Sequence, residues 1–160
     1  ADRDRPKERR GGTTPIPGKI AEFLQRHHVL SLAVQDAQGL WAASCFYACD
    51  LAAGQLIVLT SLKTRHGQQM SQTPVVAGTI SGQPEHWRDI CGLQFTASAQ
   101  LLAGADADAA LECFAERHPI ARLKRTDIWA LRLQQLKYTS NDYLFAQKTH
   151  WQRDGQVEAD

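Results

Sequence analysis

Residues 56–66 of the chain read LIVLTSLKTRH, and this stretch decides which fold the rest of the sequence must fit. It opens with four consecutive apolar residues, so we expect a strand whose two faces are both covered by other parts of the chain. A helix-like segment then runs from Thr64 to just before Pro74. The turn between the strand and the helix is therefore the leading candidate for a functional site.

This turn concentrates cations and hydroxyl groups. Its seven residues include three potential cations and three hydroxyls, namely Lys63, Arg65 and His66, and Thr60, Ser61 and Thr64. No Asp or Glu occurs between residues 51 and 84, so no sequence neighbour neutralises these cations. Because a helix N-terminus adds free N–H groups and Arg suits bidentate contact, the pattern predicts a phosphate site. The alternative is a solvated turn in which Thr64 only caps the helix.

Length and composition narrow the class of protein. At 160 residues with a net charge of +1, the chain fits one domain and not a general nucleic-acid coat. No apolar run is long enough for a membrane helix, so we expect a soluble, cytoplasmic protein with no membrane or nucleic-acid partner. The four cysteines form no C-x-x-C pair, so we expect free thiols and no metal site.

The remaining chain predicts a mainly β (α+β) domain. Residues 1–14 contain no large apolar side chain and are expected to form a disordered arm, leaving a single domain at 15–160. Six strands are expected, at about 29–35, 40–49, 56–60, 75–80, 93–102 and 128–139. Helices are expected from Pro17, from Thr64, and from a cap at Asp106 or Asp108 as far as Pro119. The last strand changes phase, which predicts a bulge near residues 134–135. Six strands, many of them joined by short turns, favour an antiparallel barrel over a parallel sheet.

The run from residue 58 to 66, followed by Gln69-Met70 and Pro74-Val75-Val76, resembles the flavin-phosphate segment of the pyridoxamine 5'-phosphate oxidase-like split-barrel superfamily. More narrowly, the similarity to the YhbP-like (UPF0306) family spans about residues 20–153 and rests on these segments: 41–47, 63–66, 76–79, 82–84, 92–95 and Trp151.

The resemblance implies a six-stranded antiparallel split β-barrel with flanking helices, and a homodimer with FMN at the subunit interface. It assigns Thr60, Thr64 and Arg65 to the FMN phosphate, with His66 in the usual place of a Lys and Lys63 as an added cation. The strand that would present backbone groups to the isoalloxazine ring contains Ser44, Cys45 and Phe46.

The function expected from the resemblance is a small FMN-dependent oxidoreductase of unknown substrate, with NADH or NADPH as a candidate electron donor. The sequence identifies no catalytic residue. The oxidases' pyridoxine-phosphate residues have no match here, with only Lys148 and Trp151 as candidate contributors, so vitamin B6 oxidation is not transferred.

Two alternatives remain open at this point. One is a non-catalytic flavin-binding or redox-sensing module. The other, less favoured, is a haem-binding split barrel, for which the candidate ligands are His66, His86, His118 and His150.

Overall fold

Eight antiparallel strands form one sheet in the structure, a computed structural model that describes residues 14–141, 147–155 and 158–159. The helices are α1 (Gly18–Arg26), α2 (Arg65–Gln72) and α3 (Gly104–Arg117), with 3-10 turns η1 (Trp87–Asp89) and η2 (Pro119–Arg122). The strands are β1 (Val29–Asp36), β2 (Gly39–Asp50), β3 (Gln55–Leu59), β4 (Val75–Ser81), β5 (Cys91–Leu101), β6 (Ile128–Ser140), β7 (Gln147–Gln152) and β8 (Glu158–Ala159).

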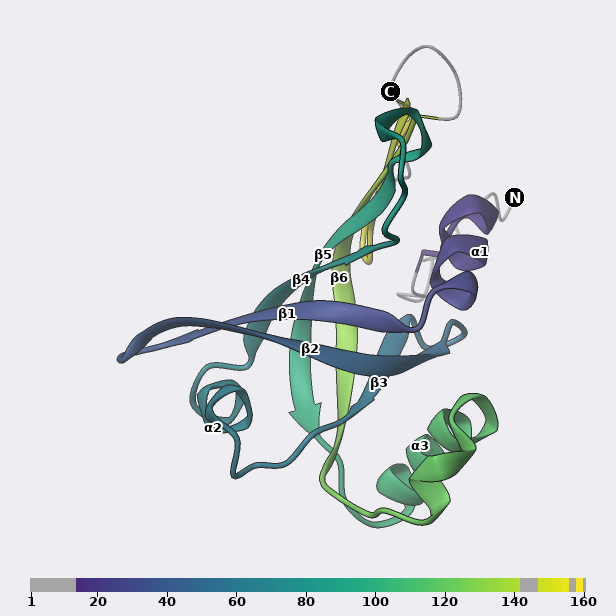
Figure 1. Cartoon of the computed structure of the whole chain (residues 1–160). Helices are drawn as coiled ribbons and strands as arrows, with labels where there is room; N and C mark the ends of the chain where they lie inside the picture. The colour runs from purple at the N-terminus through teal and green to yellow at the C-terminus, as the bar shows by residue number, and fades with distance from the viewer. Residues whose placement is uncertain (1–13, 142–146, 156–157, 160) are drawn as a thin grey trace, which may run out of the picture.

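The predicted six-stranded barrel is confirmed. The strand order is β3-β2-β1-β4-β5-β6-β7-β8, and an additional β3–β6 pairing closes the first six strands into a ring. β6 pairs with β3 from Ile128 to Arg132 and with β7 from Gln135 to Ser140, so the barrel splits where β6 changes partners. Figure 1 shows the result: β4, β5 and β6 extend upward, away from β1 and β2.

A bulge marks the split. Thr96 pairs with Gln135 and Ala97 with Leu133, so Gln134 is the extra residue on β6, at the predicted position. Strands bend and twist more strongly at a bulge, which lets β6 leave β3 and join β7.

The core lies on both sides of β3, as the continuously apolar sequence predicted. Leu56 and Val58 belong to the main core inside the barrel, which α1 closes with Ile20 and Phe23. Ile57 faces the other way, into a second cluster beneath α3. β3 is therefore fixed on both faces, which gives the turn after it a rigid starting point.

The structure differs from the sequence-based expectations at α3 and at the C-terminal end of the sheet. α3 begins at Gly104 with Ala103 as its N-cap, so neither Asp106 nor Asp108 caps it. The sequence did not predict β7 and β8; in β7 the hydrophobic signal is weak because only Trp151 is buried. The expected disordered arm, 1–14, lies outside the described residues except for Thr14, which hydrogen-bonds to Arg153 and Gly155.

No helix in the described ranges combines the length and the apolar character needed to cross a membrane.

Candidate functional site

The turn after β3 is held by the start of β6. The Thr60 N–H donates to the Asp127 carbonyl at 3.0 Å, and the Leu62 N–H donates to Asp127 Oδ2 at 2.8 Å. Trp129 Nε1 donates to the Thr60 carbonyl at 3.0 Å. The fold thus brings a carboxylate to this turn from outside the acid-free interval, which the sequence did not predict.

The first turn of α2 packs against the same segment. The Thr64 hydroxyl donates to the Ser61 carbonyl at 2.7 Å and accepts from the Gly67 N–H at 3.0 Å, so Thr64 is the helix N-cap. A Cβ at position 67 would lie 2.3 Å from the Ser61 carbonyl oxygen, which requires glycine there. The N–H groups of Arg65 and His66 occupy the first helical positions, where the helix offers no acceptor. They are available to an anion.

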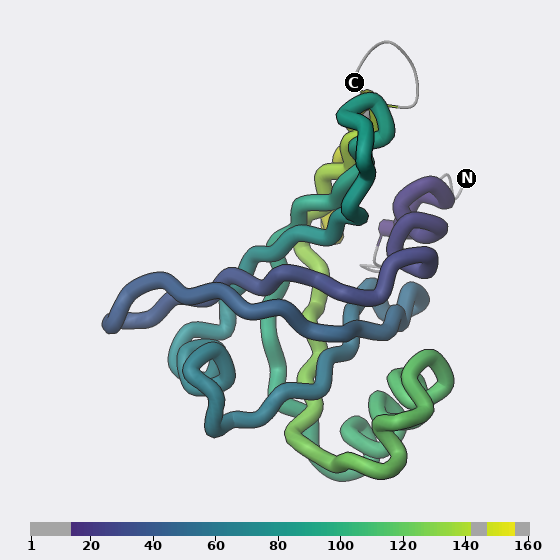
Figure 2. The backbone as a smooth tube through the Cα atoms, in the orientation of Figure 1, coloured from purple at the N-terminus to yellow at the C-terminus, as the bar shows by residue number. Residues whose placement is uncertain are grey.

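Arg65 is exposed and already oriented. Its guanidinium carbon lies 4.1 Å from the centroid of the Trp41 ring, which is cation–π geometry. Trp41 belongs to the β1–β2 hairpin, which projects from the barrel over α2 (Figure 2). Gln69 of α2 fixes this hairpin, since its Nε2 donates to Asp36 Oδ1 and to the Gly39 carbonyl, both at 2.9 Å.

His66 does not supply a permanent positive charge. Its Nε2 shares a 2.5 Å hydrogen bond with the Thr60 hydroxyl. Burial lowers the pKa of His66 below its ordinary value, which favours the neutral ring. The fixed cations at the turn are therefore Arg65 and the exposed Lys63.

The strand proposed to face the flavin ring has an open edge. β3 pairs with β2 only from Tyr47 to Asp50, so among the described strands none lies beside the β3-facing edge of residues 41–46. Ser44 and Phe46 are exposed on the outer face, whereas Cys45 is buried toward the core. The backbone groups of this edge can bind a ligand, and the Cys45 side chain points away from it.

The structure thus places the expected site residues in one region. The turn carries Thr60, Lys63, Thr64, Arg65 and His66, and the open β2 edge leaves the β3 pairing next to Thr60. Within it, the Thr60 and Thr64 hydroxyls already have protein partners. Sequence reasoning missed Asp127 and Trp41, because both reach the turn from distant segments. It also missed the requirement for Gly67, although glycine at a helix start is a local signal.

The histidines considered as haem ligands do not converge. His66 bonds to Thr60, His118 Nε2 bonds to the Tyr47 carbonyl, His150 pairs with Lys137 in the sheet, and His86 precedes η1 at the far end of β4 and β5. Trp151, a candidate contributor, is fully buried and donates to the Thr14 carbonyl, while Lys148 is exposed.

Solved structures with this fold bind different cofactors. A pyridoxamine 5'-phosphate oxidase-related, FMN-binding protein from Nostoc punctiforme matches with a TM-score of 0.70 at 14% identity, covering 92% of this chain and 97% of that one. HutZ, the haem storage protein of Vibrio cholerae, matches with a TM-score of 0.62 at 20% identity, covering 91% and 95%. A haem-binding protein from Mycobacterium smegmatis matches with a TM-score of 0.66 at 16% identity, covering 92% and 59%. These likenesses establish the pyridoxamine 5'-phosphate oxidase-like split-barrel fold.

Proteins found by sequence similarity share more residues with this chain than these structures do. No protein-family model matches the chain. A UPF0306 protein of Haemophilus ducreyi is 47% identical over 140 residues, which cover 86% of this chain and 96% of the relative. The UPF0306 protein YhbP of Salmonella paratyphi B is 37% identical over 139 residues, which cover 87% and 95%. The chain belongs to the UPF0306 family.

Proposed function

We propose that this protein binds FMN, with the phosphate at the start of α2 and the isoalloxazine ring along the open edge of β2. One observation carries the proposal: the Arg65 guanidinium and the first N–H groups of α2 lie at the turn beside an unpaired strand edge. Lys63 and Arg65 provide the charge for a phosphate. Gly67 fits this role, since it lets the turn fold tightly onto the helix N-terminus.

The proposed activity is that of a small flavin-dependent oxidoreductase, with NADH or NADPH as a candidate donor. Bound FMN supplies hydride-transfer chemistry, while the protein binds and orients it. The residues of this chain would anchor the phosphate and hold the ring against β2. No catalytic side chain is assigned.

We also propose a homodimer. The outer face of β1, β2 and β4 is exposed and carries a row of paired alanines, Ala42, Ala33 and Ala77. Phe46 and Val75 are exposed at opposite ends of this face, 57% and 67% respectively. An exposed apolar patch of this kind is typical of a protein interface.

Ligand selectivity tests the phosphate assignment. The double variant Lys63→Ala/Arg65→Ala should bind FMN at least about tenfold more weakly, while riboflavin affinity changes little, because only FMN carries the phosphate. Lys19→Ala, which removes an exposed lysine from α1, is the matched control. Flavin absorbance and fluorescence titrations measure both ligands. Failure of the wild-type protein to bind micromolar FMN would refute the proposal.

A turnover assay distinguishes an oxidoreductase from a non-catalytic flavin-binding module. Reduction of the bound flavin by NADH or NADPH, followed by repeated turnover with an added acceptor, is expected for an oxidoreductase. Tight FMN binding without turnover would instead assign a flavin-binding or redox-sensing module.

A second candidate, haem binding, is favoured by one surface feature. The exposed Phe46 ring contacts two imidazoles: His28, with ring centroids 6.1 Å apart and planes at 9°, and His118, edge-on with centroids 5.4 Å apart. His28 is exposed, and an imidazole is one of the side chains that ligate haem iron, while an aromatic ring offers a face for a planar porphyrin. Hemin titration of the wild type and of His28→Ala tests this: haem binding predicts a Soret shift that the variant loses. No shift in the wild type would exclude this candidate.

A further inference from the structure

The two fixed cations of the candidate phosphate turn differ in how firmly they are held. Within the described part of the chain, the Lys63 ammonium has no hydrogen-bond or ion-pair partner. Arg65 instead rests on Trp41, with 4.1 Å between the guanidinium carbon and the ring centroid. The N–H donors of a guanidinium lie in its plane, so contact with a ring through the face leaves them available to an anion. Trp41 thus restricts the Arg65 side chain without using up its donors.

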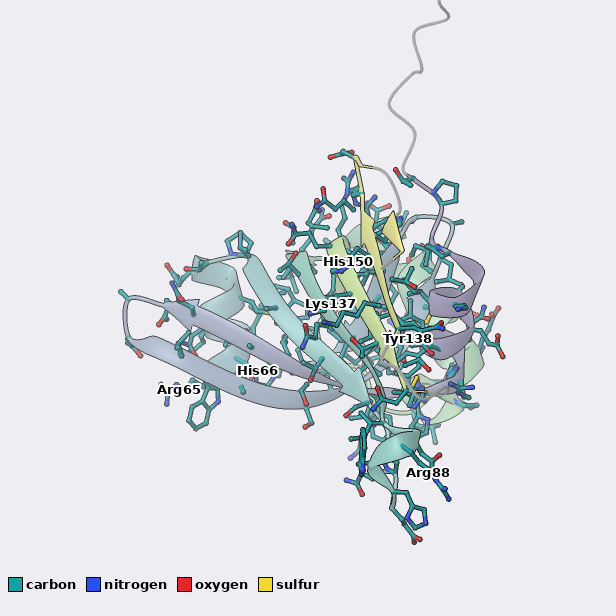
Figure 3. All side chains as sticks on the ribbon, turned by 90° about the horizontal axis from the view of Figure 1, so that it is seen from above. Arg65, His66, Arg88, Lys137, Tyr138 and His150 are labelled. Carbon is teal, nitrogen blue, oxygen red and sulfur yellow. The ribbon has the colours of Figure 1, made fainter. Side chains whose placement is uncertain are left out.

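The hairpin that carries Trp41 is anchored to the helix that carries Arg65. Figure 3 shows Arg65 beside this β1–β2 hairpin. The anchor is Gln69, which is 2% exposed and donates from Nε2 to Asp36 Oδ1 and to the Gly39 carbonyl, both at 2.9 Å. Gln69 follows Arg65 by four residues, so the two side chains leave α2 on the same side. One face of α2 therefore presents the guanidinium and also holds the strand turn that brings the indole ring to it.

The Gln69 anchor leaves one of its own atoms unsatisfied. Its Oε1 is buried and has no hydrogen-bond partner among the described residues. A buried acceptor without a donor destabilises a fold, and an apolar side chain of similar size would avoid this penalty. Such a side chain could not donate to the hairpin, however. The position of the hairpin is thus maintained at some expense of stability, which is typical of segments with a functional role.

We infer that Trp41, held in place by Gln69, positions Arg65 for the terminal phosphate of the flavin and so sets the preference of the site for FMN over riboflavin. A side chain that is already ordered loses less conformational freedom when its ligand binds. Trp41 acts through Arg65 and does not itself contact the ligand. This positioning role rests on the proposed FMN function, to which it adds the residues that determine phosphate selectivity.

The ratio of FMN affinity to riboflavin affinity tests the role of the indole ring. Trp41→Leu should bind FMN about three- to tenfold more weakly, with riboflavin affinity unchanged, because the freed Arg65 side chain must then be ordered on binding. Trp41→Phe keeps an aromatic face and should restore most of the loss. Trp87→Leu, which replaces an exposed tryptophan of η1, is the matched control. Flavin fluorescence titrations measure both ligands.

A double-mutant cycle with Arg65→Ala separates positioning from direct contact. If Trp41 acts through Arg65, Trp41→Leu should have no further effect on FMN binding once Arg65 is replaced. A ring that stacks on the flavin would instead weaken FMN and riboflavin equally in both backgrounds, and that result would overturn the inference. If Lys63→Ala/Arg65→Ala shows the phosphate-selective loss but Trp41→Leu binds FMN as the wild type does, the inference fails while the proposed function stands. A wild type that binds no FMN removes both.

Gln69→Leu tests the anchor while Trp41 and Arg65 stay in the chain. It removes both donors to the hairpin and should reproduce the selective loss of FMN affinity, whereas Gln68→Leu, at an exposed position of α2, should not. In the ligand-free protein, the ring current of Trp41 should shift the NMR resonance of the Arg65 Nε–H proton upfield. Trp41→Leu and Gln69→Leu should both move this resonance toward that of a free arginine. A resonance unchanged in both variants would show that the ring does not hold Arg65, whether or not a flavin binds.

Discussion

Gly67 shows how a single missing side chain shapes the candidate phosphate site. The turn after β3 passes so close to α2 that a Cβ at position 67 would meet the Ser61 carbonyl at 2.3 Å and the Thr64 hydroxyl at 2.9 Å. Neither atom can move freely, because Thr64 caps the helix and Asp127, just before β6, holds the turn. The tight approach places the Arg65 and His66 N–H groups at the turn.

Gly67→Ala should therefore lower both stability and FMN affinity. Overpacking of this kind costs about 1–3 kcal/mol of the free energy of unfolding, measured by urea denaturation. Gly18→Ala is the control, since a Cβ at position 18 of α1 meets nothing within 4 Å. That variant should be neutral or stabilised by up to about 1 kcal/mol. Equal behaviour of the two variants would contradict the role given to Gly67.

His66 should give the stability of the protein a pH dependence of known sign. Burial lowers the pKa of His66 in the folded state, so the unfolded chain takes up a proton more readily as the pH falls. The free energy of unfolding should therefore decrease as the pH drops below the ordinary histidine value of about 6.5.

His66→Gln isolates this contribution, because an amide keeps hydrogen-bonding capacity toward Thr60 and does not titrate. Between about pH 7.5 and 5.5 the variant should lose less stability than the wild type, as read from urea midpoints. A wild-type-like loss would mean that another group controls the dependence.

Sequence alone predicted the polar residues of the turn and not the contacts that position them. Lys63 and Arg65 were identified because cations in an acid-free interval stand out locally. Asp127 is 65 residues from Leu62, and Trp41 reaches Arg65 only through the hairpin that Gln69 fixes. Such contacts depend on the register of the barrel, which no local pattern contains.

At the scale of elements, Arg153 stabilises the split between β3 and β7. This residue is 3% exposed, and its Nε donates to the Leu133 carbonyl at 2.7 Å beside the bulge. One of its terminal nitrogens donates to the Ala53 and Gly54 carbonyls, in the loop before β3. The phase change in the sequence predicted the bulge, but the side chain that bridges the opening follows β7, a strand that the hydrophobic pattern did not reveal.

Arg153→Met should lower the free energy of unfolding by about 2 kcal/mol, because it removes the guanidinium donors to the Leu133, Ala53 and Gly54 carbonyls at the split. Arg153→Lys should also destabilise, since an ammonium group cannot reproduce the planar guanidinium geometry. Arg132→Met, on the same split but exposed, is the control and should have little effect. Urea denaturation monitored by tryptophan fluorescence measures all three. If Arg153→Met is as stable as the wild type, the hydrogen bonds of Arg153 do not stabilise the split.

At the scale of the molecule, the outer sheet face carries a strip of three small residues, Ala42, Ala33 and Ala77. Ala33 lies near the middle of this strip, paired with Ala42 on β2 and Ala77 on β4. All three side chains are exposed in the single chain, so a substitution there does not disturb the core. The strip therefore permits a test of assembly that is separate from folding.

Ala33→Glu should convert the proposed dimer into a monomer. In a C2 interface along this strip the two introduced carboxylates would lie close together and out of water, and like charges so placed cost several kcal/mol of association free energy. Sedimentation equilibrium should give half the wild-type mass, with a far-UV circular dichroism spectrum that is unchanged. Ala33→Ser adds a polar atom without charge and should remain dimeric. Because the flavin is expected at the subunit interface, the monomer should lose affinity for riboflavin as well as for FMN. A dimeric Ala33→Glu protein would refute the proposed interface, whereas a monomer that keeps both affinities would place the flavin within one chain.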